Sequence, residues 1–299
     1  MAPDPFFSVV IPTYNRADFI KFTIESVLDQ QFQDFEIIVV DDGSSDETER
    51  VVKDISSPKI RYYKKQNGER GAARNTGVDF SRGLYVTFLD SDDILYSNHL
   101  AVSHSELTEL KFPQIYHQAY ELRYLDGRKK KSDVDAGTTI NDALFVKGNV
   151  LSCMGVFLKC DTARSIPFNE DRELSGVEDW ELWIRLAARY PFCHGKTITG
   201  ALMDHEGRSV IKANRTELVK KMNLLFKYVY QDDAVKNEYS KFRGVLKANI
   251  NAYISLHLSG NRVDKFVAVK FLVNGFTQSP RVFFRRRTFA ILRNLIFSW

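Results

Sequence analysis

The chain alternates between short apolar runs of strand type and segments whose apolar residues recur at helical spacing. Apolar runs at residues 8–11, 36–40 and 85–89 each end in polar, turn-forming residues. Between them, residues 20–28 and 71–80 show the spacing of short helices. Near-continuous apolar strands that alternate with helices are typical of a parallel sheet covered on both faces. The pattern therefore predicts an α/β fold.

The third apolar run ends abruptly in acid, with Asp90, Asp92 and Asp93, and the second runs into Asp41 and Asp42. In open α/β sheets, ligands bind outside the carboxyl ends of the strands, so we expect these polar ends to face one cleft. Two carboxylates one residue apart can share a hard divalent cation, which often accompanies a phosphate-bearing substrate. The alternative is an acidic turn or helix start, where Asp is common.

Two local signals refine the pattern. Ser44 and Glu47 precede an apolar helical repeat and predict a capping box. Asp126-Gly127 predicts a hairpin turn, and the basic run 128–131 after it is interpreted as a solvated loop.

The last 90 residues favour helices throughout, and charge separates them from the rest. Residues 1–199 carry 24 Lys/Arg and 31 Asp/Glu, a net charge of −7, whereas residues 200–299 carry 18 and 7, a net charge of +11. We therefore expect an α/β domain over 1–210 and a helical region over 211–299. The predicted helices span 214–230, 233–258, 262–277 and 281–297.

Segment 280–299 contains five arginines and no acid, interleaved with aromatic and aliphatic residues. A basic, aromatic-rich amphipathic helix suits the interface of an anionic membrane. The alternatives are a terminal helix packed on the domain with solvated arginines, or a contact in an oligomer. No nucleic-acid motif accompanies the charge, so we expect no nucleic-acid partner.

No stretch reaches the roughly 18 to 20 continuous apolar residues of a membrane span. The first residues lack the basic flank and apolar core of a signal peptide. The three cysteines, Cys153, Cys160 and Cys193, have no metal-ligand spacing and indicate thiols in a reducing compartment. We expect a cytoplasmic protein, or one peripheral at the inner face of the cell membrane.

Five sequence blocks resemble family 2 glycosyltransferases, inverting enzymes of the GT-A fold that use nucleotide-activated sugars. They occur in the order and spacing of that family and lie within residues 6–210. The blocks are Val10-Ile-Pro-Thr-Tyr-Asn15, Val40-Asp-Asp-Gly-Ser-Ser45, Gly71-Ala-Ala-Arg-Asn-Thr-Gly77, Leu89-Asp-Ser-Asp-Asp93 and Gly176-Val-Glu-Asp-Trp-Glu-Leu-Trp183. The implied fold is a Rossmann-like, mostly parallel sheet with helices on both faces and a C-terminal helical appendage.

The resemblance implies a donor site for a UDP-sugar. Tyr14 would stack on the uracil with Pro12 in the same pocket, and Asp42 would accept the uracil ring N–H. Arg70, or failing that Arg74, would meet the base or the diphosphate. The alternative is that these arginines are exposed in a loop and only solvated.

The resemblance also implies a Mn²⁺ or Mg²⁺ cofactor, with Asp92 as a ligand and Asp90 reaching the ribose or a metal-bound water. Asp93 is expected outside the metal's first ligands. His205 is a candidate third ligand, and Arg208 is a candidate phosphate-binding residue.

Glu178 and Asp179 precede an amphipathic helix and match the family's Glu-Asp motif. By that match Asp179 is the catalytic base, and Glu178 positions the acceptor or supports the helix end; an acid that caps the helix is the alternative. Trp180 is a candidate floor of the acceptor site, and Trp183 is assigned to the core.

The sequence thus predicts a metal-dependent inverting glycosyltransferase that moves a sugar from a UDP-sugar to a glycan or lipid-linked oligosaccharide in surface polysaccharide biosynthesis. One alternative is a sugar-phosphate nucleotidyltransferase, which normally has a Gly-rich basic loop that residues 12–15 lack. The other is a non-catalytic nucleotide-sugar-binding protein.

Overall fold

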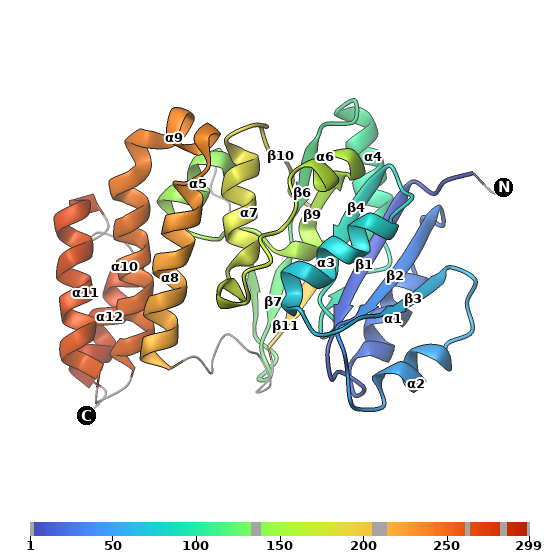
Figure 1. Ribbon diagram of the computed structural model, residues 1–299, viewed down its shortest axis with the longest axis horizontal. Helices are drawn as coiled ribbons and strands as arrows, with labels where there is room; N and C mark the ends of the chain where they lie inside the picture. Colours follow the sequence, from blue (N-terminus) through green and yellow to red (C-terminus); the bar gives the residue numbers. More distant parts are fainter. Residues whose placement is uncertain (1–2, 133–138, 205–213, 261–263, 282–285, 298–299) are drawn as a thin grey trace.

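The computed structural model describes residues 3–132, 139–204, 214–260, 264–281 and 286–297. Figure 1 shows two regions: a sheet flanked by helices, built from the first two thirds of the chain, and a group of helices built from the last third. The helix α7 (Glu178–Ala187) stands between them.

A seven-stranded sheet forms the centre of the first region, in the order β10-β6-β9-β4-β1-β2-β3. β1 pairs in parallel with β2 and β4, and β2 pairs in parallel with β3, while β9 runs antiparallel to both of its neighbours. The predicted mostly parallel sheet is confirmed. The strands are β1 (Phe7–Thr13), β2 (Phe35–Asp41), β3 (Ile60–Lys64), β4 (Tyr85–Phe88), β6 (Ile115–Gln118), β9 (Val156–Lys159) and β10 (Cys193–Gly195).

Both faces of this sheet are buried. Successive residues of a strand point to opposite faces, so Val9 and Ile11 join one hydrophobic cluster and Val10 joins another. This accounts for the near-continuous apolar strands in the sequence. The covering helices are α1 (Ile20–Leu28), α2 (Thr48–Lys53), α3 (Glu69–Phe80), α4 (His99–Glu109), α5 (Ile140–Val146), α6 (Cys160–Ser165) and α7.

The capping box predicted at Ser44 is wrong. The Ser44 hydroxyl accepts the backbone N–H of Asn15 at 2.9 Å, which joins the loops after β1 and β2. Helix α2 begins later, at Thr48, whose N–H donates to the Asp46 carboxylate at 3.0 Å. The Ser44 side chain therefore stabilises the contact between the loops after β1 and β2 and does not cap α2.

A small second sheet carries the hairpin. Its order is β5 (Ile94–Leu95), β11 (Gly200–Met203), β7 (Glu121–Arg123) and β8 (Lys129–Lys131). The Asp126-Gly127 turn is confirmed, because Gly127 has φ of +82° and its N–H donates to the Tyr124 carbonyl at 3.0 Å. The basic run is exposed as expected, but Lys129–Lys131 form a strand rather than a loop.

Five helices follow: α8 (Arg215–Val229), α9 (Asp233–Tyr239), α10 (Arg243–Ser259), α11 (Lys265–Gln278) and α12 (Arg286–Phe297). A 3₁₀ turn, Ser240–Phe242, interrupts the single helix predicted over 233–258. Leu218, Met222 and Leu225 of α8 belong to the same hydrophobic cluster as Trp183 of α7. The helical region thus shares a core with the sheet region.

Helix α12 packs on α10 along one side. Thr288 and Ile291 are buried there, and Leu295 contacts the main hydrophobic cluster, whereas Phe289 and Ile296 are exposed. Within the described ranges, no helix is long and apolar enough to cross a membrane.

Candidate active site

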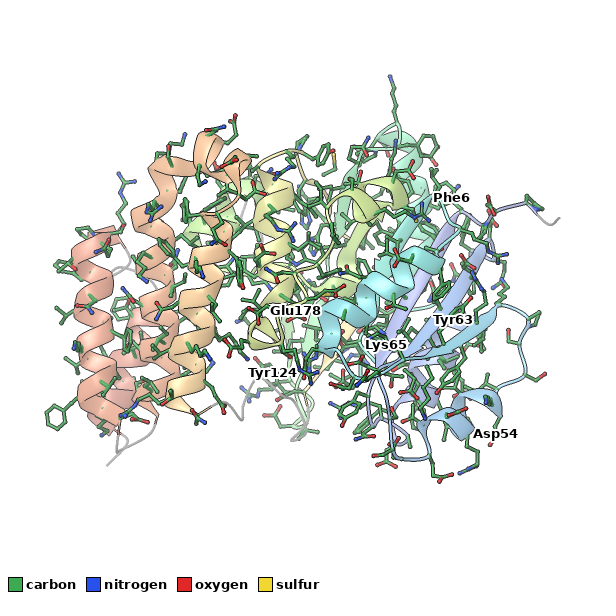
Figure 2. The ribbon with its side chains drawn as sticks, viewed as in Figure 1. Phe6, Asp54, Tyr63, Lys65, Tyr124 and Glu178 are labelled. Carbon is green, nitrogen blue, oxygen red and sulfur yellow. The ribbon has the colours of Figure 1, made fainter. Side chains whose placement is uncertain are left out.

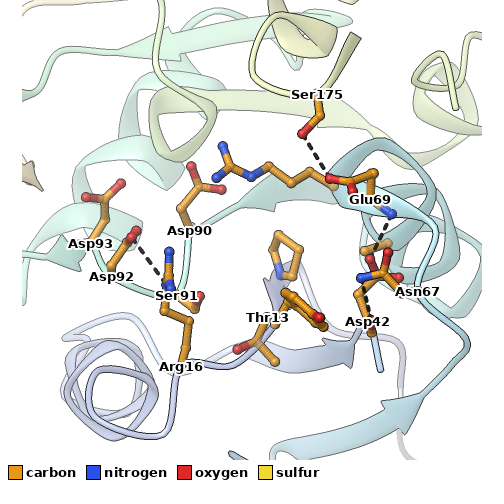
Figure 3. A pocket seen from close by; sticks show the side chains of 14 residues that line it. Thr13, Arg16, Asp42, Asn67, Glu69, Asp90, Ser91, Asp92, Asp93 and Ser175 are labelled. Carbon is orange, nitrogen blue, oxygen red and sulfur yellow. Dashed lines mark hydrogen bonds and ion pairs between the residues drawn. The ribbon is translucent and has the colours of Figure 1, made fainter. Parts of the chain in front are cut away.

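A cavity of about 280 Å³ lies at the carboxyl edge of β1, β2 and β4. Figure 3 shows Asp90, Asp92 and Asp93 on one side of this cavity, facing Asp42 and Glu69 on the other. The prediction that the polar ends of three strands face one cleft is confirmed. The lining residues are Pro12, Thr13, Tyr14, Arg16, Asp42, Asn67, Glu69, Arg70, Ala73, Asp90, Ser91, Asp92, Asp93 and Ser175.

The base-binding candidates lie together in this cavity. Tyr14 is exposed at the mouth, next to the buried Pro12, so its ring is accessible to a flat ligand. Asp42 is buried, and its Oδ1 accepts from Lys65 Nζ at 3.0 Å and from Gly68 N–H at 2.9 Å, while its Oδ2 accepts from Glu69 N–H at 2.8 Å. Asp42 therefore anchors the start of α3 as well as lining the cavity.

Asp41 has a structural role. Its carboxylate accepts the Ser44 N–H at 2.7 Å and the Tyr62 hydroxyl, so it ties the end of β2 to β3. Burial and the hydrogen bond to Asp41 raise the pKa of Tyr62 well above its ordinary value.

The two carboxylates proposed for the metal are partly exposed and line the cavity. Asp90 Oδ1 accepts from Arg74 Nη2 at 2.7 Å, and Asp92 Oδ2 lies 3.6 Å from Arg16 Nε. Asp93 is buried, and its Oδ1 accepts the Met203 N–H at 2.9 Å, which joins the loop to β11. Asp93 thus has a structural role at the cleft edge.

The donor set fits a hard cation that is completed by substrate. In the described part of the chain, no three His, Cys, Asp or Glu side chains gather as a self-sufficient metal site. Mg²⁺ and similar ions are usually bound by one or two carboxylates together with substrate phosphates and waters. Asp90 and Asp92 match that mode. His205 and Arg208 lie outside the described residues.

Arg74 connects this acidic pair to the Glu-Asp motif. Its guanidinium is almost fully buried and donates from Nη1 to Glu178 Oε1 at 2.6 Å and from Nη2 to Asp90 at 2.7 Å. Burial opposes its charge, but Asp90 and Glu178 outweigh that effect and hold the pKa of Arg74 well above its ordinary value. Arg70 and Arg74 both lie on α3 and neither is exposed, so the alternative of solvated loop arginines does not hold.

Glu178 is the first residue of α7, beside α3 (Figure 2), and it is buried. Its Oε2 accepts the N–H of Gly176, and its Oε1 accepts from Arg74. Gly176 has φ of +90°, a backbone conformation that favours glycine and lets the chain turn into the helix. Glu178 therefore fixes the loop that precedes Asp179.

Asp179 is held by two donors. Its Oδ2 accepts from Asn149 Nδ2 at 2.8 Å, its Oδ1 accepts the Trp180 N–H at 2.7 Å, and Cys153 Sγ lies 4.0 Å away. Burial and, next, the charge of Glu178 raise the pKa of Asp179 to about 6, against the opposing effects of Arg74 and Asn149. A carboxylate with that pKa is suited to accept a proton near neutral pH.

The two tryptophans of α7 are both buried. Trp180 donates its indole N–H to the Leu144 carbonyl at 3.0 Å, and Trp183 is part of the main core. The assignment of Trp183 is confirmed, whereas Trp180 as an exposed floor for an acceptor sugar is wrong. The sequence pattern alone did not show that Trp180 belongs to the core. Its hydrogen bond to the Leu144 carbonyl holds it there.

Three residues of the site were not predicted from the sequence. Arg16 approaches Asp92, Lys65 pairs with Asp42, and Asn149 holds Asp179. For Asn149 the sequence offered one signal, the preceding Gly148, because glycine often marks a turn. In the structure Gly148 has φ of +103°, which such a turn requires. Lys65 and Arg16 had no such signal, since their partners lie about 23 or more positions away in the sequence.

Comparison with known proteins agrees with this geometry. Residues 8–118 match the family described as "Glycosyl transferase family 2". A Campylobacter jejuni GalNAc(5)-diNAcBac-PP-undecaprenol beta-1,3-glucosyltransferase is 43% identical over 101 residues, which is 32% of this chain and 33% of that protein. The chain spans 18% to 33% of the length of the first curated relatives it matches.

Two solved structures are similar over nearly the whole chain. Staphylococcus aureus TarS 1–349 in complex with UDP has a TM-score of 0.64 at 19% identity and covers 97% of this chain and 88% of its own. The Pyrobaculum calidifontis mannosyltransferase PcManGT in complex with GDP-Man and Mn²⁺ has a TM-score of 0.57 at 16% identity and covers 99% and 90%.

The sheet order, the acidic cleft and these similarities define a protein of the GT-A fold. Within that fold, residues 8–118 match glycosyl transferase family 2.

Proposed function

We propose that the chain is a metal-dependent inverting glycosyltransferase that moves a sugar from a nucleoside-diphosphate sugar to an acceptor hydroxyl. One observation carries this proposal: Arg74 binds both Asp90 of the metal pair and Glu178, the neighbour of Asp179. A single buried cation thereby holds the donor-side and the acceptor-side carboxylates at one cleft.

The proposed donor is a UDP-sugar. Tyr14 offers an accessible ring for stacking beside Pro12, and Asp42 offers carboxylate lone pairs to a ring N–H. TarS, which shares the fold, is known in complex with UDP and with UDP-GlcNAc, while PcManGT binds GDP-Man. Because proteins of this fold bind either UDP or GDP-Man, the fold does not select the base. The chemistry of Tyr14 and Asp42 supports uracil. Arg70, which lines the cavity, is assigned to the diphosphate.

Asp92 and Asp90 would hold Mn²⁺ or Mg²⁺, with His205 as a further candidate ligand and Arg208 as a phosphate contact. The bound cation would neutralise charge on the departing nucleoside diphosphate. Arg74 orients Asp90 through its ion pair, and Asp93 fixes the backbone directly after the two ligands by accepting the Met203 N–H.

Asp179 is proposed as the base that takes the proton of the acceptor hydroxyl as that oxygen attacks the anomeric carbon. Attack from the face opposite the leaving group inverts the configuration there. Asn149 and the Trp180 N–H orient the carboxylate, and Glu178 fixes the loop before it. Burial keeps the pKa of Asp179 near the operating range of such a base.

The proposed acceptor is a glycan or a lipid-linked oligosaccharide in surface polysaccharide biosynthesis. The Campylobacter relative carries a polyprenyl-diphosphate-linked acceptor in its name, which favours a lipid-linked substrate here. Such an acceptor would place the protein at the inner face of the cell membrane.

A thermal-shift screen of nucleotide sugars with Mn²⁺, followed by an assay of donor hydrolysis, tests the proposal. A ligand that binds the folded state stabilises it by mass action, so the true donor should raise the melting temperature more than UDP-sugars that carry another sugar. Donor hydrolysis should disappear in Asp179→Asn. Binding without hydrolysis in the wild type would favour a non-catalytic binding protein, and release of diphosphate from a nucleoside triphosphate with a sugar phosphate would favour a nucleotidyltransferase.

A further inference from the structure

Helix α11 presents an apolar stripe to solvent. Phe266, Val269, Val273 and Phe276 recur at spacings of three, four and three residues and are all exposed, with Phe266 91% exposed. The opposite side of the helix buries Ala268, Leu272 and Gly275, and α11 makes its main packing contact with α10. Single exposed apolar residues are ordinary, but a continuous stripe on one helix indicates a contact surface.

The stripe continues onto α12. Lys265 Nζ at the start of α11 donates to the Leu295 carbonyl near the end of α12, so the two helices lie side by side there. Next to this contact stand Phe266 of α11 and Ile296 of α12, and Phe289 lies two turns from Ile296 on the same exposed face. The stripe and these two side chains form what we call the α11–α12 surface.

Cations and no acids accompany this surface. From Lys265 to Ile296 the sequence has seven Lys/Arg and no Asp or Glu. One of them, Arg287, packs on Tyr253 and the Lys147 carbonyl and does not belong to the surface. Lys265 and Lys270 flank the stripe on α11, and Arg293 shares the exposed face of α12 with Phe289. Figure 1 shows α11 at the end of the molecule farthest from β3 and α2.

We propose that the α11–α12 surface docks onto an anionic lipid membrane, with its apolar side chains in the headgroup region and its cations on the lipid phosphates. Aromatic and aliphatic side chains flanked by Lys and Arg are the composition that binds such interfaces. A second copy of this chain fits less well, because pairing two such surfaces would bring like charges together. Helix α11, with 14 residues, also offers only two heptads to a coiled coil.

This inference is independent of the proposed reaction, since lipid binding needs neither donor nor metal. It also changes which residues carry the expected membrane contact. Segment 280–299 alone was expected to do so, but one face of α12 packs on α10. In the described residues, α11 has four exposed large apolar side chains and α12 has two. Point substitutions are therefore a cleaner test than truncation, because removing α12 would also remove the buried Thr288 and Ile291.

The test is co-sedimentation of the full chain with vesicles of phosphatidylcholine alone and of phosphatidylcholine with phosphatidylglycerol. The wild type should bind the anionic vesicles roughly tenfold or more tightly than the neutral ones, and added salt should weaken that binding. Phe266→Asp and Phe289→Asp should each lower binding to anionic vesicles roughly tenfold or more.

Phe22→Asp is the matched control, because Phe22 is 64% exposed on α1 and Phe289 is 65% exposed. The control makes the same change in charge at the other end of the molecule and should bind as the wild type does. No binding by the wild type, equal binding to both kinds of vesicle, or unchanged binding by both test variants would overturn the proposal. A wild-type dimer in light scattering that Phe266→Asp dissociates would overturn it in favour of a second copy.

Discussion

Replacing Arg74 by Met removes the buried cation that joins the two sides of the cleft while it keeps most of the side chain's apolar length. In the wild type, Glu178 Oε1 is 2.6 Å from Nη1 and Asp90 Oδ1 is 2.7 Å from Nη2. Glu178 is buried, so in Arg74→Met its charge would remain inside the protein without its direct ion-pair partner. Asp90 is partly exposed and can be solvated instead.

The cost should therefore come from Glu178. Breaking a buried ion pair by removing one partner destabilises a protein by about 3–5 kcal/mol, because the other charge stays buried. Replacing both partners by uncharged groups costs much less, since no buried charge is left. We expect Arg74→Met to lose about 3–5 kcal/mol of unfolding free energy, and we expect Arg74→Met/Glu178→Gln to recover most of that loss.

Urea unfolding of the wild type, both single variants and the double variant measures these differences in one thermodynamic cycle. A matched control is Arg50→Met, whose ion pairs with Glu47 and Asp54 are on the surface; exposed pairs contribute about 0–1 kcal/mol. The reasoning is refuted if Arg74→Met is no less stable than Arg50→Met. It is also refuted if the double variant loses the sum of the two single losses.

Three further predictions concern the proposed base. Asp179→Asn should lower turnover roughly 10²–10⁴-fold while UDP affinity, measured by calorimetry, stays near wild type; a parallel fall in affinity would make Asp179 part of the donor site. Turnover should fall as pH drops through about 6, where Asp179 takes up a proton. In Asn149→Ala this fall in turnover should occur at higher pH, because the Asn149 side-chain amide stabilises the ionised form of Asp179 in the wild type. Since the pKa of Asp179 is raised on folding, its charge destabilises the protein above that pH, and Asp179→Asn should melt higher than wild type at pH 8 but not at pH 4.

Of the buried internal strands, the sequence predicted β1, β2 and β4 but not β6 and β9, and it also missed the edge strand β3. β1, β2 and β4 are fully buried and therefore nearly all apolar, which made them recognisable. β3 is an edge strand with partly exposed residues, Ile-Arg-Tyr-Tyr-Lys, and it lacks a continuous apolar run. The break at Ser240–Phe242 was missed for a different reason, because no Gly or Pro marks that 3₁₀ turn.

The sequence predicted many of the residues that line the cleft. It did not predict which side chains those residues contact. Asp42, Asp90 and Asp92 stand at strand ends, and the topology of a parallel sheet is enough to bring them to one edge. The bridge from Arg74 to Glu178 spans 104 positions, and it depends on how α7 packs against α3. Burial of Trp180 likewise depends on α5, whose Leu144 carbonyl accepts its N–H.

The most direct test of the central claim is isothermal titration of UDP, with and without Mn²⁺, into the wild type and into Asp92→Ala. Asp92 is a side-chain ligand in this account, so the wild type should bind UDP more tightly with Mn²⁺, and the variant should show equal, weak binding in both conditions. Asp54→Ala, an exposed acid far from the cavity, is the control and should behave as the wild type. UDP affinity that rises with Mn²⁺ in Asp92→Ala as it does in the wild type would contradict the account.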